Sequence, residues 1–190
     1  MADQPDFPLL ALGVRRIGWI RFWVQTVLGV VVISVLTFNK VGNSFSTAGR
    51  DLGLGAGLSL TTLAFLFLLY SLWQSWLIVL TGRAINSSAR PSRGETGRLL
   101  KRGLIVDLLG LVFSSIGYQS LVGALFVQAS KQAATMGITI GSAGGGTMDN
   151  FPITSLEVLS VLSNTQVLFA HLIGLIFSLW LLQRIYRNRN

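Results

Sequence analysis

Residues 82–103 read GRAINSSARPSRGETGRLLKRG, and this stretch decides how the rest of the chain is arranged. It contains six basic residues and one acid, Glu95, and a long apolar run lies on either side of it. Lysine and arginine residues beside membrane segments stay on the cytoplasmic side of a bilayer. If the apolar runs cross a membrane, residues 82–103 are therefore a basic cytoplasmic hinge that sets the direction of every other segment.

The composition is that of an integral membrane protein with a single domain over residues 1–190. Of the 190 residues, 51% are hydrophobic and only 12% are charged, whereas about a quarter of the residues in an average soluble domain are charged. The net charge is +8, but the basic residues stand at the ends of apolar runs, where the headgroups of a lipid bilayer would meet them. No basic groove with interleaved aromatic residues is visible, so we expect no nucleic-acid partner. The absence of cysteine excludes disulfides and thiolate metal sites.

Four apolar runs are long enough to cross a bilayer as helices, and they predict an all-α fold with four transmembrane helices. Of the 15 Lys and Arg residues, 12 lie in the N-terminal segment, the hinge and the C-terminal tail. This asymmetry predicts that both termini are cytoplasmic and that the glycine-rich loops, residues 128–153 among them, lie on the outer side. The predicted spans are residues 17–38, 58–80, 104–127 and 158–183.

Two of the predicted helix starts carry a capping signal. Thr154 and Glu157 form a T-x-x-E capping box before the fourth helix, and Ser92 with Glu95 could cap an extension of the third helix. We expect one unbroken fourth helix, the alternative being a bend at Asn164. The N-terminus carries acids before any basic residue, unlike a secretory signal or a plastid transit peptide, so the first helix is expected to remain as an anchor.

Arg21 and Asp107 are the charged residues inside the predicted spans. At a rise of 1.5 Å per residue, Asp107 lies about 5 Å and Arg21 about 6 Å inside the cytoplasmic boundary, so we expect them to pair. Gln25 and Gln74 lie within reach of that pair. His171 lies about 18 Å deep, so no contact between His171 and Asp107 is expected. Two interpretations of the pair stay open: a structural ion pair at the inner interface, or a site where an ion or proton enters.

Small residues mark one face of the third predicted helix and one face of the fourth. In the third helix, glycine recurs every seven residues beside Asp107, and a stripe of small residues lets helix backbones approach closely. We therefore predict a packing seam between the two helices, with Ile105, Val112 and Ile116 facing lipid on the opposite side. The predicted seam residues are Gly103, Gly110, Ser114, Gly117, Gly174 and Ser178.

His171 shares the small-residue face of the fourth helix. We expect it to hydrogen-bond across the seam; the alternatives are an axial ligand to the metal of a pigment or haem, and a ligand to a transported metal. A lone histidine without a second His, a Cys or a nearby carboxylate is a poor metal site. The metal that His171 would bind in either alternative is therefore unknown. No catalytic Ser/His/Asp pattern, phosphate-binding loop or paired carboxylate is recognisable, and we expect no enzyme.

Three stretches of the sequence resemble a known family, namely FWVQ at 22–25, GLIVDLLG at 103–110 and HLIGLIFSLWLLQR at 171–184. Through them the chain is similar to cyanobacterial members of the family of the chloroplast inner-envelope protein called permease in chloroplasts, also described as a Tic translocon component. The resemblance implies four helices, a cyanobacterial thylakoid or plasma membrane, and a role in iron uptake or in the import or assembly of membrane proteins. Plastid members have Asn at the position of Asp107 and no Arg at that of Arg21, which favours a packing role for the pair.

The sequence therefore supports two functions, and the favoured one is given first. The first is a permease-type membrane protein that moves iron or another metal ion as a homo-oligomer, because four helices with one buried histidine do not readily line a pathway alone. The alternative is a non-catalytic accessory or assembly subunit of a photosynthetic or protein-translocation complex, whose apolar faces contact partner proteins, lipids, chlorophyll or carotenoid. A polar path reaching Gln74 and His171 would favour transport, and a dry core would favour the subunit.

Overall fold

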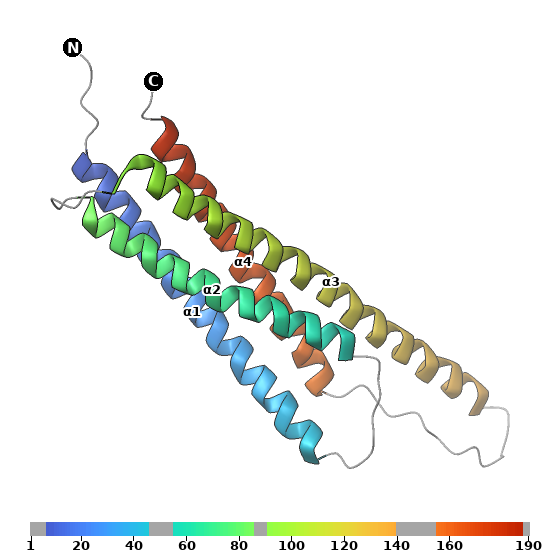
Figure 1. Ribbon diagram of the computed structural model, residues 1–190. Helices are drawn as coiled ribbons and strands as arrows, with labels where there is room; N and C mark the ends of the chain where they lie inside the picture. The colour runs from blue at the N-terminus through green and yellow to red at the C-terminus, as the bar shows by residue number, and fades with distance from the viewer. Residues whose placement is uncertain (1–6, 46–54, 86–90, 140–154, 188–190) are drawn as a thin grey trace.

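The computed structural model of the chain is a bundle of four antiparallel helices (Figure 1). It describes residues 7–45, 55–85, 91–139 and 155–187, and these ranges contain no strand. The all-α fold with four helices predicted from the sequence is confirmed. In chain order the helices are α1 (Phe7–Phe45), α2 (Gly55–Ala84), α3 (Arg93–Thr139) and α4 (Ser155–Arg187).

Three of the helices contain segments long and apolar enough to cross a membrane, so the protein is an integral membrane protein. These segments are Ala11–Phe38, Gly57–Ala84 and Glu157–Tyr186. The remaining predicted span, residues 104–127, lies in α3, which packs along both α2 and α4. The start of α1, the end of α2, the start of α3 and the end of α4 lie at one end of the bundle (Figure 1), which we call the basic end because its arginines cluster there.

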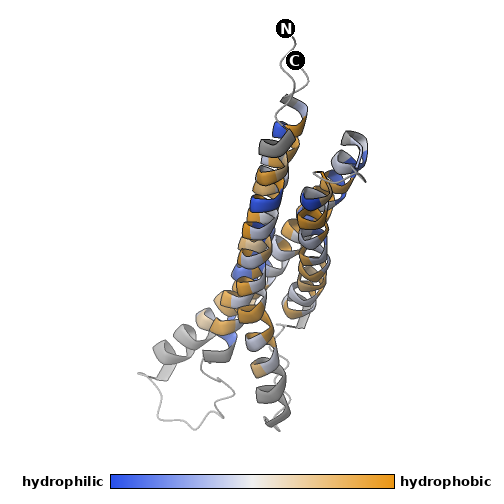
Figure 2. Ribbon diagram, turned by 90° about the vertical axis from the view of Figure 1, so that its left-hand side faces the viewer, coloured by the Kyte–Doolittle hydropathy of each residue, from blue (hydrophilic) through white to orange (hydrophobic). Residues whose placement is uncertain are grey.

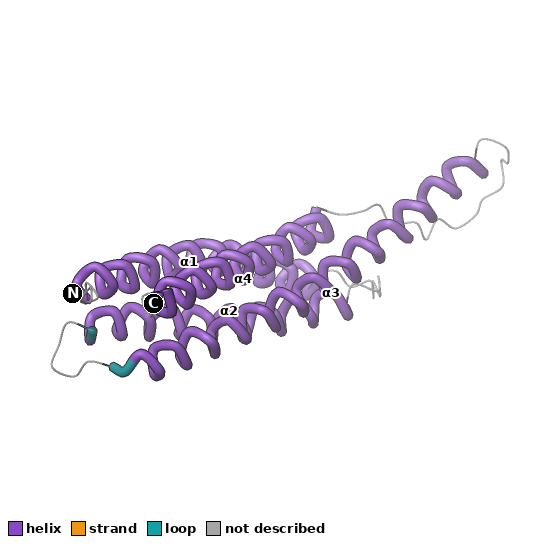
Figure 3. Tube along the Cα trace, turned by 90° about the horizontal axis from the view of Figure 1, so that it is seen from above, coloured by secondary structure: helices purple, strands orange, loops and turns teal. Residues whose placement is uncertain are grey.

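The helices continue beyond the predicted spans. α3 begins inside the predicted hinge and ends inside the predicted outer loop, and Figure 3 shows its last turns extending past the other helices. Its start is a capping box, as Ser92 and Glu95 had indicated: the Ser92 N–H donates to Glu95 Oε2 at 2.8 Å, and the Glu95 N–H donates to Ser92 Oγ at 3.1 Å. α4 is one unbroken helix through Asn164, as expected, while Thr154 lies outside the described residues.

The inward-facing residues follow a seven-residue repeat with alternating steps of three and four. This spacing is the signature of the coiled-coil-like packing found in four-helix bundles, where helices cross at about 20°. Around the bundle the order is α1, α2, α3, α4; the backbones of α2 and α4 also approach each other across the middle, whereas those of the described parts of α1 and α3 do not. In α3 the buried repeat is Gly103, Asp107, Gly110, Ser114, Gly117 and Leu121.

Two apolar clusters fill the interior, with a layer of polar side chains between them. The outside carries large apolar side chains, as lipid requires, and Ile105, Val112 and Ile116 face outward as predicted, each about half exposed (54%, 46% and 51%). Figure 2 shows this hydrophobic character along all four ribbons. The cluster at the basic end contains Ala11, Val14, Ile78, Ile85, Leu100, Leu181 and Ile185. The cluster further along contains Val32, Ala64, Phe65, Leu68, Val167 and Ala170.

Candidate functional site: a buried polar layer between the four helices

An ion pair joins α1 and α3, whose described backbones do not lie against each other. Arg21 Nη2 of α1 lies 2.8 Å from Asp107 Oδ2 of α3, and both side chains are completely buried. The long arginine side chain crosses the interior between α2 and α4 to make this contact. Breaking a buried ion pair by removing one partner typically costs about 3–5 kcal/mol, because the other charge is left without compensation. The pair predicted from the sequence is therefore a brace across the bundle.

Hydrogen bonds from α2 and α4 also hold the two charges, while the buried Nε of Arg21 has no partner among the described residues. Ser71 Oγ donates to Asp107 Oδ1 at 2.6 Å and accepts from Arg21 Nη2 at 2.9 Å. Arg21 Nη1 donates to Ser178 Oγ at 2.6 Å. Charged groups in a low-dielectric interior need such partners, because their attraction to each other alone does not offset the cost of removing them from water. All four helices thus contribute to holding one positive and one negative charge.

Gln25 extends the network along α1. Its Nε2 donates to Ser71 Oγ at 3.0 Å and to the Ala170 carbonyl at 3.2 Å, and its Oε1 accepts from Ser75 Oγ at 2.9 Å. Gln25 and Ser75 are fully buried. The amide group therefore links α1 to both α2 and α4 beside the ion pair.

Gln74 is buried next to the ion pair without bonding to it. Its Nε2 donates to the Tyr70 hydroxyl at 3.3 Å, and its Oε1 has no hydrogen-bond partner among the described residues. A Cβ added at Gly103 would lie 3.3 Å from this oxygen and 3.7 Å from the guanidinium of Arg21. Because Gly103 has no side chain, the Gln74 amide and the Arg21 guanidinium have space beside α3.

His171 belongs to the same layer, and the expectation that it would not touch Asp107 is wrong. Its Nδ1 lies 3.3 Å from Asp107 Oδ1, and its Nε2 lies 3.1 Å from the carbonyl oxygen of Ala64. The depth estimate failed because it took α3 to start near Leu104. Asp107 lies 14 residues, about 21 Å, from the start of α3, and His171 lies 16 residues, about 24 Å, from the end of α4. The two side chains are therefore at the same level.

The small residues predicted as a seam are the positions that make room for this layer. A Cβ at Gly110 would overlap the ring of His171, and a Cβ at Gly174 would lie 2.5 Å from Asp107 Oδ2. Gly117 packs against α2, where a Cβ would come within 3.4 Å of the Gly57 carbonyl. These glycines allow polar side chains on one helix to lie against the backbone of the next.

A second, smaller polar cluster lies two turns further from the basic end. Asn164 Nδ2 donates to the carbonyl of Ser114 at 2.7 Å, and Thr61 Oγ1 lies 2.9 Å from Asn164 Oδ1 and 2.8 Å from the Gly57 carbonyl. Asn164 and Thr61 are completely buried. This cluster joins α2, α3 and α4, and the apolar cluster around Leu68 separates it from the ion pair.

Sequence reasoning found Gln74 of α2 but missed Ser71 and Ser75 on the same helix. Ser71 is the centre of the network, with bonds to Arg21, Gln25 and Asp107, yet no motif marked it. The available signal was the spacing of small polar residues in α2, where Thr61, Ser71 and Ser75 fall on the buried seven-residue repeat. In such an apolar helix, the composition does not distinguish a buried serine from an exposed one. Only its position in the seven-residue repeat indicates that it faces the interior.

The layer is a hydrogen-bond network whose polar groups bond mostly to one another; of its buried side-chain atoms, Arg21 Nε and Gln74 Oε1 have no partner among the described residues. Both oxygens of Asp107 accept hydrogen bonds. The two ring nitrogens of His171 face acceptors, Asp107 Oδ1 and the Ala64 carbonyl, and a neutral imidazole donates to one of them. Across the described ranges, no group of three or more His, Cys, Asp or Glu residues is placed to hold a metal ion. The two residues with metal-ligating side chains are thus engaged in joining helices, and the Arg21 guanidinium occupies the position next to the carboxylate where a cation would bind.

Comparison with known proteins identifies the family. The chain belongs to the family described as "Protein of unknown function (DUF3611)", which matches residues 4–186. It is 27% identical over 178 residues to the Arabidopsis thaliana protein named "Protein TIC 21, chloroplastic", covering 90% of this chain and 56% of that protein. The chain therefore spans about half the length of this relative. The resemblance seen in the sequence motifs is confirmed for the family, and no solved structure was found to match.

Proposed function

We propose that this chain is a non-catalytic subunit of a larger membrane-protein complex, in which its four-helix bundle is a rigid scaffold for assembly. The observation that carries the proposal is the buried polar layer, in which contacts between helices hold Arg21, Asp107 and His171. Its charged and ring groups bond to one another across four helices, so the interior serves to fix one arrangement of the helices. The outer faces, with their exposed large apolar side chains, are then the surfaces available to partner proteins and lipids.

The proposed setting is a cyanobacterial thylakoid or plasma membrane. The family relation supports a photosynthetic organism, because the relative is named as a chloroplastic protein. The clustering of exposed arginines at one end of the bundle supports a cytoplasmic position for that end, and therefore for both chain termini. Within this setting, a complex for protein translocation or for the assembly of photosynthetic proteins is the proposed partner.

A second candidate function is the transport of iron or another metal ion by a homo-oligomer. One observation favours it: a carboxylate and an imidazole, both common metal ligands, lie 3.3 Å apart inside a membrane bundle. For a cation to bind there, Arg21 would have to release Asp107, and further ligands would have to come from elsewhere, since metal sites in proteins usually have four or more. Metal transport therefore requires a rearrangement of the Arg21–Asp107 pair, whereas the scaffold function does not.

We propose that His171 acts through hydrogen bonds and not as a pigment ligand. An axial ligand to a chlorophyll or haem metal must present a free ring nitrogen to the metal. Nδ1 of His171 faces Asp107 and Nε2 faces the Ala64 carbonyl, so binding a pigment would break one of these contacts. A chlorophyll or carotenoid in the complex is then expected on the outer faces of the bundle.

Two measurements test these proposals together. Purification of the tagged chain from its native membrane in a mild detergent should give a heteromeric complex whose partners are identified by mass spectrometry. Reconstitution of the chain alone into liposomes, loaded with a fluorescent iron indicator, should give no more Fe²⁺ uptake than empty liposomes. Uptake that Asp107→Asn and His171→Gln each abolish, by a chain that purifies without other proteins, would contradict the scaffold and establish the transporter.

A further inference from the structure

We propose that the α1–α2 face at the basic end of the bundle binds an anionic phospholipid. The phosphate of its headgroup would be held by Arg15, Arg16 and Arg83. An aromatic layer, which lies next to these arginines on the side toward the middle of the bundle, would contact the part of the acyl chains nearest the headgroup. The aromatic layer consists of Trp19, Phe22, Trp23 and Trp76.

The three arginines are exposed and have no acidic partner among the residues that the structure describes. Arg15, Arg16 and Arg83 all have exposed side chains, and none forms an ion pair with any described residue. The acids that the structure describes are engaged elsewhere. Glu95 caps α3, Asp107 pairs with Arg21 in the interior, and Glu157 is buried near the start of α4.

Close contact between α1 and α2 brings the arginines of the two helices together. A Cβ added at Gly82 would lie only 2.8 Å from the backbone nitrogen of Arg15, and one at Gly18 would lie 3.2 Å from the backbone nitrogen of Val79. Because Gly82 and Arg83 are neighbours in sequence, the two helices place Arg15 and Arg83 at the same level. With Arg16 next to Arg15 in sequence, three exposed basic residues start from adjoining turns of α1 and α2 at the basic end.

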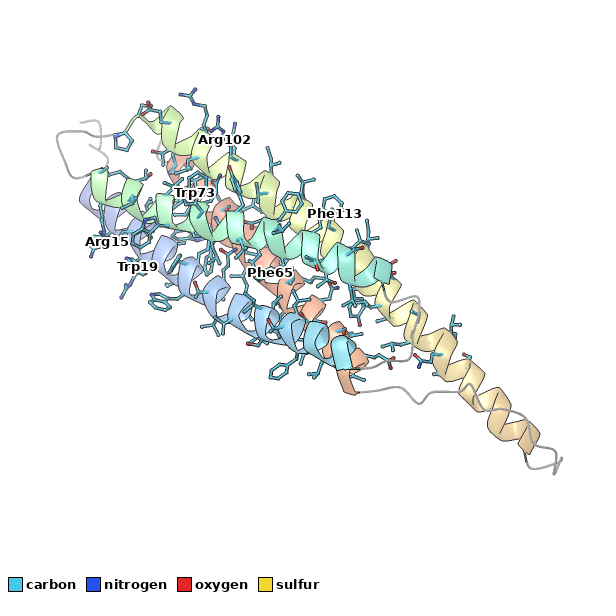
Figure 4. All side chains as sticks on the ribbon, turned by 60° about the horizontal axis from the view of Figure 1, so that its bottom comes forward. Arg15, Trp19, Phe65, Trp73, Arg102 and Phe113 are labelled. Atoms are coloured by element: carbon cyan, nitrogen blue, oxygen red, sulfur yellow. The ribbon has the colours of Figure 1, made fainter. Side chains whose placement is uncertain are left out.

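The aromatic layer lies on the same face, one to two turns deeper. Trp19 of α1 and Trp76 of α2 meet edge to face with ring centroids 5.8 Å apart, Trp76 also packs on Phe22 at 5.9 Å, and Trp19 stacks on Trp23 at 6.1 Å. Trp23 is 58% exposed and Trp76 37%. Figure 4 shows Arg15 and Trp19 on the same side of α1.

The register of the two helices matches the shape of a phospholipid. Trp23 follows Arg16, and Trp76 precedes Arg83, by seven residues each, which is two turns and about 10 Å along the same face. A phosphate held by the arginines would therefore continue into acyl chains that lie along the tryptophan rings. Basic clusters beside membrane helices attract anionic lipids by about 1 kcal/mol for each Lys or Arg, and tryptophan favours this boundary between headgroup and hydrocarbon.

The chain contains its own matched control. Arg98, Lys101 and Arg102 of α3 are also three exposed basic residues at the basic end, but they lie on another helix, away from the α1–α2 aromatic layer. A site built from charge and aromatic rings together should distinguish the two clusters. A general attraction between positive charge and an anionic surface should not.

The test is native mass spectrometry of the chain released from nanodiscs that contain equal amounts of phosphatidylglycerol and phosphatidylcholine. The wild-type chain should retain phosphatidylglycerol over phosphatidylcholine by about tenfold or more. Arg15→Gln, Arg16→Gln and Arg83→Gln in one chain should lower this preference to about twofold or less. The chain with Arg98→Gln, Lys101→Gln and Arg102→Gln should keep it. Equal losses in both triple variants, or no preference in the wild type, would overturn the proposal.

Tryptophan fluorescence gives a second, independent reading. Phosphatidylglycerol with brominated acyl chains should quench the fluorescence of the wild type more than brominated phosphatidylcholine does at the same mole fraction. The difference should disappear in the variant lacking Arg15, Arg16 and Arg83 and persist in the α3 variant. Equal quenching by the two lipids in the wild type would contradict a phospholipid seated on the aromatic layer.

Discussion

Arg15 and Arg21 lie on the same helix, six residues apart, and have opposite surroundings. Arg21 is fully buried and bonds to Asp107, Ser71 and Ser178, while Arg15 is exposed and has no acidic partner within the described ranges. Six residues turn a helix by about 240°, so the two side chains leave α1 in different directions. The comparison shows that position on the helix decides whether an arginine joins helices or faces headgroups: Arg21 points into the bundle and lies about 9 Å further along α1 than Arg15.

The sharpest way to break this comparison is to remove the partner of Arg21. Asp107→Ala would leave a buried guanidinium without a compensating charge, and we expect it to lower the free energy of unfolding by about 3–5 kcal/mol. The measurement is reversible unfolding in detergent micelles, followed by circular dichroism. Ile105→Ala, on the lipid-facing side of the same helix, is the control and should change stability far less. If the Asp107→Ala chain is as stable as the wild type, the ion pair does not contribute to the stability of the bundle.

The next effect tests the space that the glycines provide. In Gly110→Ala, the added methyl group would overlap the ring of His171, and overpacking of this kind costs about 1–3 kcal/mol. Gly123→Ala is the matched control in the same helix, because nothing lies within 4 Å of its added Cβ. There the better helix propensity of alanine should leave stability unchanged or raise it by up to about 1 kcal/mol. Equal behaviour of the two variants in thermal unfolding would contradict the seam.

Neutralising both charges should have a smaller effect than removing one. Replacing a buried ion pair by uncharged partners of similar size is often close to neutral, because the cost of burying two charges disappears with their attraction. We therefore expect Arg21→Gln with Asp107→Asn to recover most of the stability that either single substitution loses. A double-mutant cycle of unfolding free energies measures this coupling. Additive losses would show that the two residues act separately.

The smallest effect concerns the exposed start of α3. Hydrogen bonds from the backbone and side chain of Ser92 hold the pKa of the Glu95 carboxyl below its usual value of 4.5. A carboxyl with a lowered pKa in the folded state stabilises the fold above its ordinary pKa, and this contribution is lost as the pH falls through the lowered value. The protection factors for amide hydrogen exchange at the start of α3, which correct for the intrinsic slowing of exchange in acid, should therefore fall under acidic conditions below about pH 4.5. Glu95→Gln should remove this pH dependence, and an unchanged dependence in that variant would exclude Glu95 as its source.

Much of the candidate site could be predicted because charge is rare in this chain. Arg21 and Asp107 stood out in apolar runs, and the seven-residue spacing of glycine in α3 marked the face on which Asp107 lies. Ser71 and His171 show where the prediction stopped. Serine is common in membrane helices, so Ser71 carried no signal, and the level of His171 depended on helix ends that continue past the apolar segments.

The sequence by itself determined the class of protein and the number of helices, because these depend on a local quantity, the length of each apolar run. It also predicts the direction of the chain across the membrane, from the charge on either side of each run. Only the tertiary structure decided which polar groups meet. α1 and α3 lie diagonally opposite, and their contact depends on the relative rotation and translation of all four helices. An error of one residue turns a side chain by about 100°, whereas hydrogen bonds require heavy atoms about 3 Å apart. Local sequence patterns do not fix the position of one helix relative to another to that accuracy. The packing of Gly103, Gly110 and Gly174 against the polar layer does fix it.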